Sequence, residues 1–307
     1  MTAYIAPDVG EVSHQTDLTY NDAQELLRVD RPDGKFIEYG YDYAGRLGSI
    51  TTTQGVYLYD YDVSTGNLNS MTTPGGGQVR YDYNNYLINK TTWTGMVAGT
   101  VERTYDANGR VDSLGVNGSD VVSFQFNEDG QLTQAGVLNI SYDTQTGLLT
   151  GTDAGMASDA LGYNSFGEAL NYTMQYNGGD VYAEVYSYDD LGRISTKTET
   201  INRVATTYGY TYDLAGRLSQ VRQNGALIAD YSYDVNGNRL AETIAGLNGT
   251  YDDQDRLLTY GPNTYNYTAN GELTRKVNGG QTTAYQYDEF SNLISVTLPD
   301  TTPMSLS

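Results

Sequence analysis

The sequence contains no cysteine and a single histidine. The absence of cysteine excludes disulfides, thiol chemistry and thiolate metal sites. No apolar run approaches the roughly 18 residues that a membrane-spanning helix needs. The opening residues, MTAYIAPDVGEV, have neither the basic nor the apolar region of a secretory signal. If the protein acts outside a cell, we therefore expect the export signal to lie in another part of a longer polypeptide.

Basic residues are also scarce. Seventeen Lys and Arg stand against 38 Asp and Glu, which gives a net charge of −21 and a pI near 4.1. Binding to nucleic acid or to an anionic membrane surface draws on clustered cations. We therefore expect no nucleic-acid partner and no membrane insertion.

Tyrosine is the one aromatic residue present in excess, with 30 copies against five Phe and one Trp. Each tyrosine carries a flat ring together with a hydroxyl group that needs a hydrogen-bond partner. This combination suits a half-buried sheet surface better than a dry core.

A seven-residue motif repeats along the chain. It reads YDYAGRL at 41–47 and returns, in looser forms, to give fourteen copies whose starts lie 16 to 25 residues apart. A period of this size indicates one supersecondary unit stacked many times. It favours a scaffold over a protein with a single catalytic cleft. The copies begin at Tyr20, Tyr41, Tyr61, Tyr81, Tyr105, Phe126, Tyr142, Tyr163, Tyr188, Tyr212, Tyr233, Tyr251, Tyr267 and Tyr287.

The motif itself predicts a turn. Its second residue is Asp in ten copies and Asn in three, and both can cap a turn through a local hydrogen bond. The Gly position is kept in ten copies, as the fifth residue in eight of them and as the sixth in those that begin at Tyr61 and Tyr142, which suits a backbone position with positive φ. The copies that depart from this pattern at Gln24, Thr268 and Ser291 are expected to have irregular turns, whereas Asn85 and Asp255 tolerate left-handed geometry.

A second class of turn falls between the heptads, as at PDGK 32–35, PGGG 74–77 and NGG 177–179. Asn-Gly, Asp-Gly and Gly-Gly are strong hairpin signals. Between turns, β-forming residues alternate with polar ones, as in VYLYDYD at 56–62. The helix-like composition of residues 21–29 is overruled by its repeat register. The prediction is an all-β ribbon of about 28 strands in antiparallel hairpins, divided into an N-terminal segment (1–19), a repeat domain (20–298) and a C-terminal tail (299–307).

The heptads resemble YD repeats, also called RHS (rearrangement hotspot) repeats, and the similarity covers about 90% of the chain. YDYAGRLGSITTTQG at 41–55 and YDEFSNLISVTLPD at 287–300 look close to the full family repeat. The resemblance implies a ribbon that spirals into a curved or hollow shell, with tyrosines stacked in ladders. Such shells occur in bacterial polymorphic toxins, in insecticidal toxin complex B and C components, and in teneurins. The D-P-x-G-[LW] box of the bacterial C-terminal core is not found, so self-cleavage and toxicity are not implied, and the chain looks like a shell fragment.

Candidate catalytic residues are weak. His14, the only histidine, lies outside the repeats, where a solvent-exposed role is the usual one. Tyr41 with Arg46, and Tyr212 with Arg217, have a spacing suited to tyrosine-based lyase chemistry, but the repeat itself produces that spacing. The Asp residues of the motif are explained by turn capping rather than by a glycosidase-like pair.

Candidate ligand sites are equally weak. DVNGN at 234–238 and NEDGQ at 127–131 have the start of a calcium loop but not its bidentate Glu. PGGG at 74–77 lacks the Lys and helix of a phosphate loop. We therefore predict no catalytic, cofactor-binding or metal-binding residues and no cofactor.

The predicted function is a non-catalytic shell segment that encloses or presents a toxin or other polypeptide. Its predicted partners are the rest of such a shell or its cargo, and its predicted location is outside the cell or on its surface, as part of a larger bacterial polypeptide. One alternative is an extracellular module that binds carbohydrate or a receptor, with exposed aromatics around Trp93. A carbohydrate-active enzyme is the remaining alternative.

Overall fold

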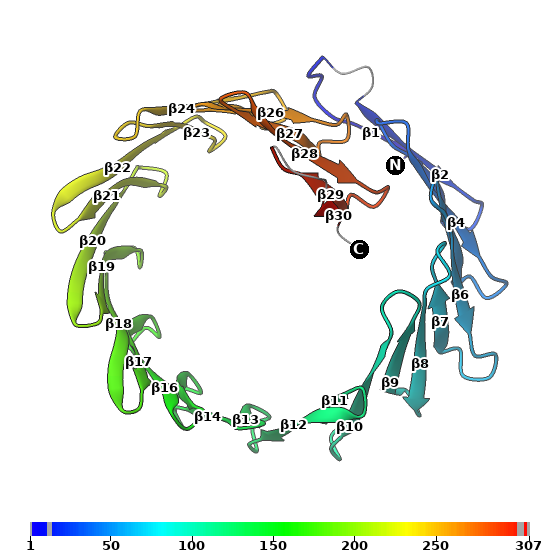
Figure 1. Ribbon diagram of the computed structural model, residues 1–307, viewed down its shortest axis with the longest axis horizontal. Helices are drawn as coiled ribbons and strands as arrows, with labels where there is room; N and C mark the ends of the chain where they lie inside the picture. Colours follow the sequence, from blue (N-terminus) through cyan, green and yellow to red (C-terminus); the bar gives the residue numbers. More distant parts are fainter. Residues whose placement is uncertain (1, 11–13, 300–303, 306–307) are drawn as a thin grey trace. The chain divides into compact units, whose positions relative to one another are not determined.

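The computed structural model describes residues 2–10, 14–299 and 304–305. This part of the chain forms thirty β-strands and no helix. Figure 1 shows the strands as a continuous series of arrows joined by short turns. The all-β prediction is therefore confirmed, and the number of strands is close to the 28 expected. A membrane-spanning helix is accordingly absent from the described residues.

Contacts divide the chain into two compact units. Unit 1 consists of residues 1–81, 92–98 and 232–307, and unit 2 consists of residues 82–91 and 99–231. The division into 1–19, 20–298 and 299–307 stays a prediction. A short strand at 3–5, in the predicted N-terminal segment, pairs with a strand at 15–20, so the ribbon begins before the first heptad.

In unit 1, consecutive strands pair antiparallel in two runs. The first run is β1 (Ala3–Ile5), β2 (Gln15–Tyr20), β3 (Leu26–Asp30), β4 (Phe36–Tyr41), β5 (Leu47–Thr52), β6 (Gly55–Tyr61) and β7 (Leu68–Thr72). The second run is β23 (Arg239–Glu242), β24 (Leu247–Tyr251), β25 (Leu257–Tyr260), β26 (Asn263–Tyr267), β27 (Leu273–Asn278), β28 (Gln281–Tyr287), β29 (Leu293–Thr297) and β30 (Met304–Ser305). Strands β8 (Gln78–Asn84) and β9 (Leu87–Thr94) are divided between the units.

In unit 2, the strands again pair antiparallel with their neighbours in sequence. They are β10 (Gly99–Tyr105), β11 (Val111–Val116), β12 (Ser119–Phe126), β13 (Leu132–Ala135), β14 (Leu138–Tyr142), β15 (Leu149–Asp153), β16 (Ala157–Tyr163), β17 (Ala169–Tyr176), β18 (Gly179–Tyr188), β19 (Ile194–Ile201), β20 (Val204–Tyr212), β21 (Leu218–Gln223) and β22 (Ala226–Tyr233).

Each heptad forms the turn between two strands. In the copy at 41–47, the Gly45 amide donates to the Asp42 carbonyl, and the Asp42 amide donates to the Arg46 carbonyl. Gly45 has φ +74°, and the strand register shifts by one residue between Gly40 and Tyr41. This is a type I turn followed by a glycine bulge, one of the common hairpin connections. The predicted roles of Asp and Gly in the turn are confirmed.

The copies that lack the motif residues keep the same backbone. Gln24 and Ser291 both adopt φ 64° and donate to the carbonyls of Asn21 and Asp288. At Thr268, the hydroxyl oxygen accepts hydrogen bonds from the Asn270 and Glu272 amides. In other copies, the side chain of Asp or Asn at position two accepts the equivalent bonds. The prediction that these three turns are irregular is therefore wrong, because the strand pairing on both sides holds the backbone in place.

The turns between heptads belong to two classes rather than one. Asn177 and Gly178, with φ 50° and 71°, form a two-residue hairpin loop with positive φ at both positions. At 31–35, by contrast, the Gly34 amide donates to Arg31 and the Arg31 amide donates to Lys35, which repeats the heptad turn geometry. The same geometry recurs at 73–77, so PGGG is a turn, as predicted.

Few apolar side chains are fully buried in this fold. Among the described residues, only Ile37 and Ala229 are buried hydrophobic side chains. A sheet with so thin a core depends on its backbone ladder and on polar contacts between neighbouring repeats. Those contacts involve the heptad residues.

Candidate functional site: stacked heptad turns, a seam and a groove

In most heptads the side chains of the second and sixth residues form a pair. Asp213 Oδ1 accepts the Ala215 and Arg217 amides, and its Oδ2 accepts Arg217 Nε at 2.7 Å. The same arrangement holds the pKa of Asp213 below its usual range, mainly through the backbone hydrogen bond from Arg217, and it recurs at Asp42, Asp106, Asp189 and Asp252.

This pair can reverse its direction. Where the second residue is Asn, the sixth is an acceptor: Asn164 Nδ2 donates to Glu168 Oε2 at 2.5 Å, and Asn127 Nδ2 donates to Gln131 Oε1 at 2.9 Å. Asn21 and Glu25 do the same at 2.6 Å. The motif therefore conserves a hydrogen bond between positions two and six within one chain, while the charge at position six changes from positive to neutral or negative.

The first-position tyrosines join each copy to the one before it. The Tyr61 hydroxyl donates to the carbonyl of Leu47, the seventh residue of the preceding heptad, at 3.0 Å. The Tyr212 hydroxyl donates to Ile194 at 2.7 Å in the same way. Most first-position rings are half-buried, so their hydroxyl groups have partners inside the sheet. Equivalent bonds to the preceding copy start from Tyr41, Tyr105, Tyr142, Tyr188, Tyr251 and Tyr267.

The sixth-position arginines also reach across to the next copy. The Arg193 guanidinium lies 4.4 Å from the centre of the Tyr212 ring, and Arg46 lies 4.4 Å from that of Tyr61. Cation–π contacts of this kind occur within about 6 Å. The ladder implied by the family resemblance is thus built from tyrosines covered by arginines. The ring-on-ring contacts at Tyr57–Phe290 and Tyr172–Tyr182 involve no first-position tyrosine.

The two pairs with lyase-like spacing are separated by this ladder. Arg46 bonds to Asp42 and covers Tyr61, whereas the hydroxyl of Tyr41 donates to Leu26. Arg217 likewise bonds to Asp213, and Tyr212 is covered by Arg193 of the preceding copy. The motif residues are engaged in contacts that hold repeats together.

A cluster of polar residues on β18–β20 is a second candidate for a catalytic site. Glu184 accepts hydrogen bonds from the Tyr182 and Tyr186 hydroxyls, and from Lys197 at 3.3 Å. Burial and the Glu184 carboxylate raise the pKa of Tyr186 to about 12. The Glu184 hydrogen bond and burial likewise raise the pKa of Tyr182. A catalytic tyrosine base needs a lowered pKa, so the cluster favours a structural network.

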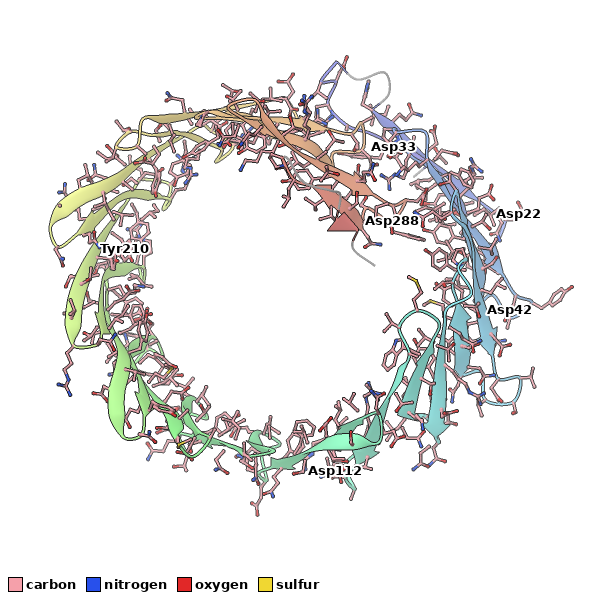
Figure 2. The ribbon with its side chains drawn as sticks, in the orientation of Figure 1. Asp22, Asp33, Asp42, Asp112, Tyr210 and Asp288 are labelled. Carbon is pink, nitrogen blue, oxygen red and sulfur yellow. The ribbon has the colours of Figure 1, made fainter. Side chains whose placement is uncertain are left out.

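Unit 1 contains a seam, defined here as the contact of the 31–35 and 52–55 hairpin turns with the heptads 267–273 and 287–293. Arg31 donates to the Glu272 carboxylate, to the Glu289 carbonyl and, at 3.0 Å, to Asp33. Lys35 Nζ donates to the Tyr287 carbonyl at 2.7 Å. Figure 2 labels Asp33 and Asp288 on the two facing segments.

Several of the most buried side chains among the described residues lie in the seam. Arg31 and Glu272 have side chains exposed by only 5% and 8%. Glu289 is 3% exposed, accepts the Thr53 hydroxyl, and has a second carboxylate oxygen that is buried without a partner among the described residues. The Tyr57 and Phe290 rings meet edge to face at 5.6 Å. The seam was not predicted from the sequence.

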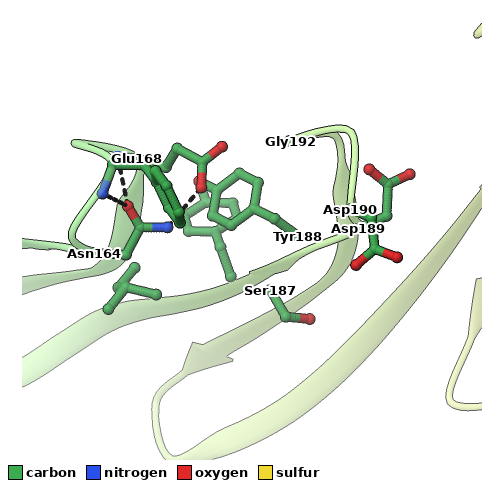
Figure 3. Close-up of a pocket in the computed structure, with 10 residues that line it drawn as sticks. Asn164, Glu168, Ser187, Tyr188, Asp189, Asp190 and Gly192 are labelled. Atoms are coloured by element: carbon green, nitrogen blue, oxygen red, sulfur yellow. Dashed lines mark hydrogen bonds between the residues drawn. The ribbon is translucent and has the colours of Figure 1, made fainter.

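Unit 2 contains a groove of about 630 Å³ between the heptads 163–169 and 188–194. Figure 3 shows the Glu168 carboxylate beside the Tyr188 ring, with Asp189 and Asp190 on the neighbouring turn. Burial, and then the charge of Glu168, raises the pKa of Tyr188. Phe166 and Leu191 line the groove and are 87% and 76% exposed.

The other residues singled out in the sequence lie apart from these features. His14 is half-buried just before β2, and its Nδ1 has no hydrogen-bond partner among the described residues. Trp93 is half-buried in β9 rather than exposed, although Met96 and Val97 nearby are exposed. In the calcium-like loop 234–238, Asp234 caps its own turn.

Comparison with known proteins assigns the fold to a family. A model of the teneurin YD-shell matches residues 2–306. Teneurin-3 of Danio rerio is 25% identical over 285 residues, covering 87% of this chain and 10% of its own length. The tRNA nuclease WapA of Bacillus subtilis is 26% identical over 222 residues, covering 71% of this chain and 8% of its own. The chain thus spans about a tenth of the length of these curated relatives.

Solved structures give the same fold. The TcdB2-TccC3 protein without its hypervariable C-terminal region superposes with a TM-score of 0.70 at 15% identity, over 92% of this chain and 19% of that one. The Photorhabdus luminescens Tc holotoxin pore gives 0.64 at 14% identity, over 92% and 19%. The YD-repeat resemblance of the heptads is therefore confirmed, and the chain belongs to the teneurin YD-shell family.

Proposed function

We propose that the chain is a non-catalytic wall segment of a YD-repeat shell that encloses or presents another polypeptide outside the cell that makes it. One observation carries the proposal above the others. The residues of the motif that could do chemistry, namely Tyr, Asp and Arg, are engaged in hydrogen bonds and cation–π contacts that join neighbouring repeats. A motif repeated fourteen times for packing serves an extended wall.

The polar groups outside the motif support the same conclusion. The phenols of Tyr182 and Tyr186 have raised pKa values and are therefore poorly suited to act as bases at neutral pH. Among the described residues, no three His, Asp or Glu side chains cluster in a metal-binding arrangement. WapA is named as a tRNA nuclease, but this chain covers 8% of it and carries a net charge of −21, which is unsuited to RNA.

Protease protection tests enclosure. The 307 residues are expressed in fusion with a protease-sensitive reporter segment. We expect the reporter to be cleaved slowly in the intact protein and rapidly when the 307 residues are deleted. Equal cleavage rates would contradict enclosure. A solution-scattering profile of the isolated chain is a second measurement, for which the proposal requires a strongly curved or hollow body.

A glycan array distinguishes the alternative binding function. The wall proposal expects no saturable binding to carbohydrates. Binding that is lost on mutating Trp93, Met96 or Val97, the aromatic and apolar residues of the β9 hairpin, would instead support the carbohydrate-binding alternative.

A further inference from the structure

We propose that the groove between the heptads 163–169 and 188–194 is a docking site for an arginine-bearing β-turn of a polypeptide partner. The proposal deepens the shell function by giving the chemistry of one partner contact. It rests on that function only in taking the partner to be a polypeptide.

The seam of unit 1 shows how such a turn is held. There, the hairpin 31–35 places Arg31 against Glu272, the sixth residue of one heptad, and against the backbone carbonyl of Glu289, the third residue of the next. The planar guanidinium satisfies both acceptors at once, as arginine does better than lysine. One arginine thus bridges two consecutive heptad turns.

The groove has acids at the same repeat positions. Glu168 occupies position six, as Glu272 does, and Asp190 occupies position three, as Glu289 does. Because Arg31 bonds to the backbone carbonyl of Glu289, the matched side-chain acceptor is Glu168, and the Asp190 carboxylate adds a second negative charge beside it. Only three of the fourteen copies have Glu at position six, those beginning at Tyr20, Tyr163 and Tyr267. At the first of these, position three of the next copy is Tyr43 rather than an acid. The groove is therefore the one pair of consecutive copies besides the seam that carries an acid at both positions, and its net negative charge, rather than the position-three acceptor itself, distinguishes it from the copy at Tyr20.

The carboxylate of Glu168 is held ready for a cation. Asn164 donates to its Oε2, while Oε1 lies on the side of Gly192, where an added Cβ would stand 2.9 Å away. The nearest arginine of these two copies, Arg193, is bonded to Asp189 and covers Tyr212. A positive charge equivalent to the one that Arg31 supplies to Glu272 would therefore come to Glu168 from outside these two copies.

The apolar residues of the groove correspond in repeat position to those of the seam, but no other segment of the described chain covers them. In the seam, Phe290 at position four is half-buried against Tyr57. In the groove, the corresponding Leu191 is 76% exposed, and Phe166 beside it is 87% exposed. An incoming polypeptide segment would cover both side chains, as Tyr57 of β6 covers Phe290 in unit 1. Position five is Gly192 in place of Ser291, so the groove offers one hydroxyl fewer.

The test is a nuclear magnetic resonance titration of the isotope-labelled 307-residue chain. The probe is a cyclic peptide with the turn sequence Arg-Pro-Asp-Gly-Lys, copied from residues 31–35, at low salt. We expect saturable shifts at the amides of residues 164–168 and 188–192, with a dissociation constant of about 1 mM or below. A peptide with citrulline, the neutral isostere of arginine, is expected to bind about tenfold more weakly.

Protein variants locate the effect. Glu168→Gln keeps a hydrogen-bond acceptor for Asn164, as Gln131 does for Asn127, and is expected to weaken binding of the arginine peptide about tenfold. It should leave binding of the citrulline peptide unchanged. Glu25→Gln makes the same change at the same repeat position outside the groove and is expected to leave the affinity unaltered.

Absence of saturable shifts in the groove, or equal binding of the arginine and citrulline peptides, would overturn the proposal. If Glu168→Gln fails to fold, the citrulline comparison on the unmodified chain still decides. A failed titration leaves the protease-protection result untouched. Conversely, a saturable titration with no protection would reject enclosure and retain the docking site.

Discussion

Replacing Glu272 with glutamine is expected to open the seam of unit 1. The Glu272 and Arg31 side chains are only 8% and 5% exposed, so the guanidinium would remain buried with half of its counter-charge removed. Removing one partner of a buried ion pair costs about 3–5 kcal/mol. Because Asp33 still accepts from Arg31 at 3.0 Å, we expect the lower end, about 3 kcal/mol.

The same carboxylate makes the seam sensitive to acid. Burial alone would raise the pKa of Glu272, but hydrogen bonds from Thr268, Ser291 and Asn270, together with the charge of Arg31, outweigh it and hold the pKa at about 2. A folded pKa below the ordinary 4.5 means that the stabilisation is fully present above about pH 4.5 and is lost as the pH falls towards 2. The difference corresponds to about 3 kcal/mol.

Hydrogen exchange measured by mass spectrometry resolves this local opening, which a global melting curve of a repeat protein would not. At neutral pH, Glu272→Gln should reduce the protection of segments 26–41 and 267–293 roughly a hundredfold, with little change in unit 2. After correction for intrinsic exchange rates, the unmodified protein should lose protection in these segments between pH 4.5 and 3, whereas the variant should show no such transition.

Glu168→Gln is the matched control. It changes the same repeat position, where the side chain has Asn164 but no arginine, and the Asn127–Gln131 pair shows that a glutamine fits. Its stability should change by less than about 1 kcal/mol. Equal losses of protection in the two variants would refute the assignment of Arg31 and Glu272 as the pair that holds the seam.

Three further predictions concern the ladder, and urea unfolding checks each. Tyr212→Phe removes the hydroxyl that donates to Ile194 at 2.7 Å and should cost about 1 kcal/mol. Phe126→Tyr supplies the hydroxyl missing at position one. If it reaches the Val111 carbonyl as Tyr212 reaches that of Ile194, the protein should gain up to about 1 kcal/mol; a loss would mean that the ring is placed differently. Gln24→Gly relieves a left-handed residue at φ 64° and should gain about 1 kcal/mol, and no gain would show that strand pairing already absorbs the strain.

The hairpin ribbon could be predicted because its signals are local. Asp42 and Gly45 occupy positions that a type I turn with a glycine bulge requires, and alternation between the turns gives the strands. The same local reasoning failed at Gln24, Thr268 and Ser291. There the flanking ladders set the backbone, and the residue adapts to a turn that its own chemistry does not favour.

The contact between copies was only partly visible in the sequence. Asp at position two occurs with Arg at position six, as in Asp213 and Arg217, and Asn occurs with Glu, as in Asn164 and Glu168. These combinations indicate from the sequence alone that positions two and six are bonded. Nothing in a single heptad shows that the arginine also covers the tyrosine of the next copy, because that depends on the stagger between neighbouring turns.

The seam had no signal at all in the sequence. Arg31 and Glu272 are 241 residues apart, and each sits in a turn whose local sequence explains it completely. Long-range pairing of this kind depends on how the ribbon returns past its own beginning within unit 1. Local propensity carries no information on that path.

In a repeat protein, residues that bind another segment are expected at the positions where the copies differ. Position one is Tyr in thirteen of the fourteen copies and position two is Asp or Asn in thirteen, and their bonds are internal. Position six varies from Arg to Glu, and positions three and four vary from Ala to Phe, and it is these positions that Arg31 and Tyr57 contact in the seam. An arginine at position six is neutralised by its own Asp, whereas a glutamate there is not, and when it is buried, as Glu272 is, it needs a cation from elsewhere. The pattern of position-six residues should therefore record which turns of the wall meet another segment of polypeptide.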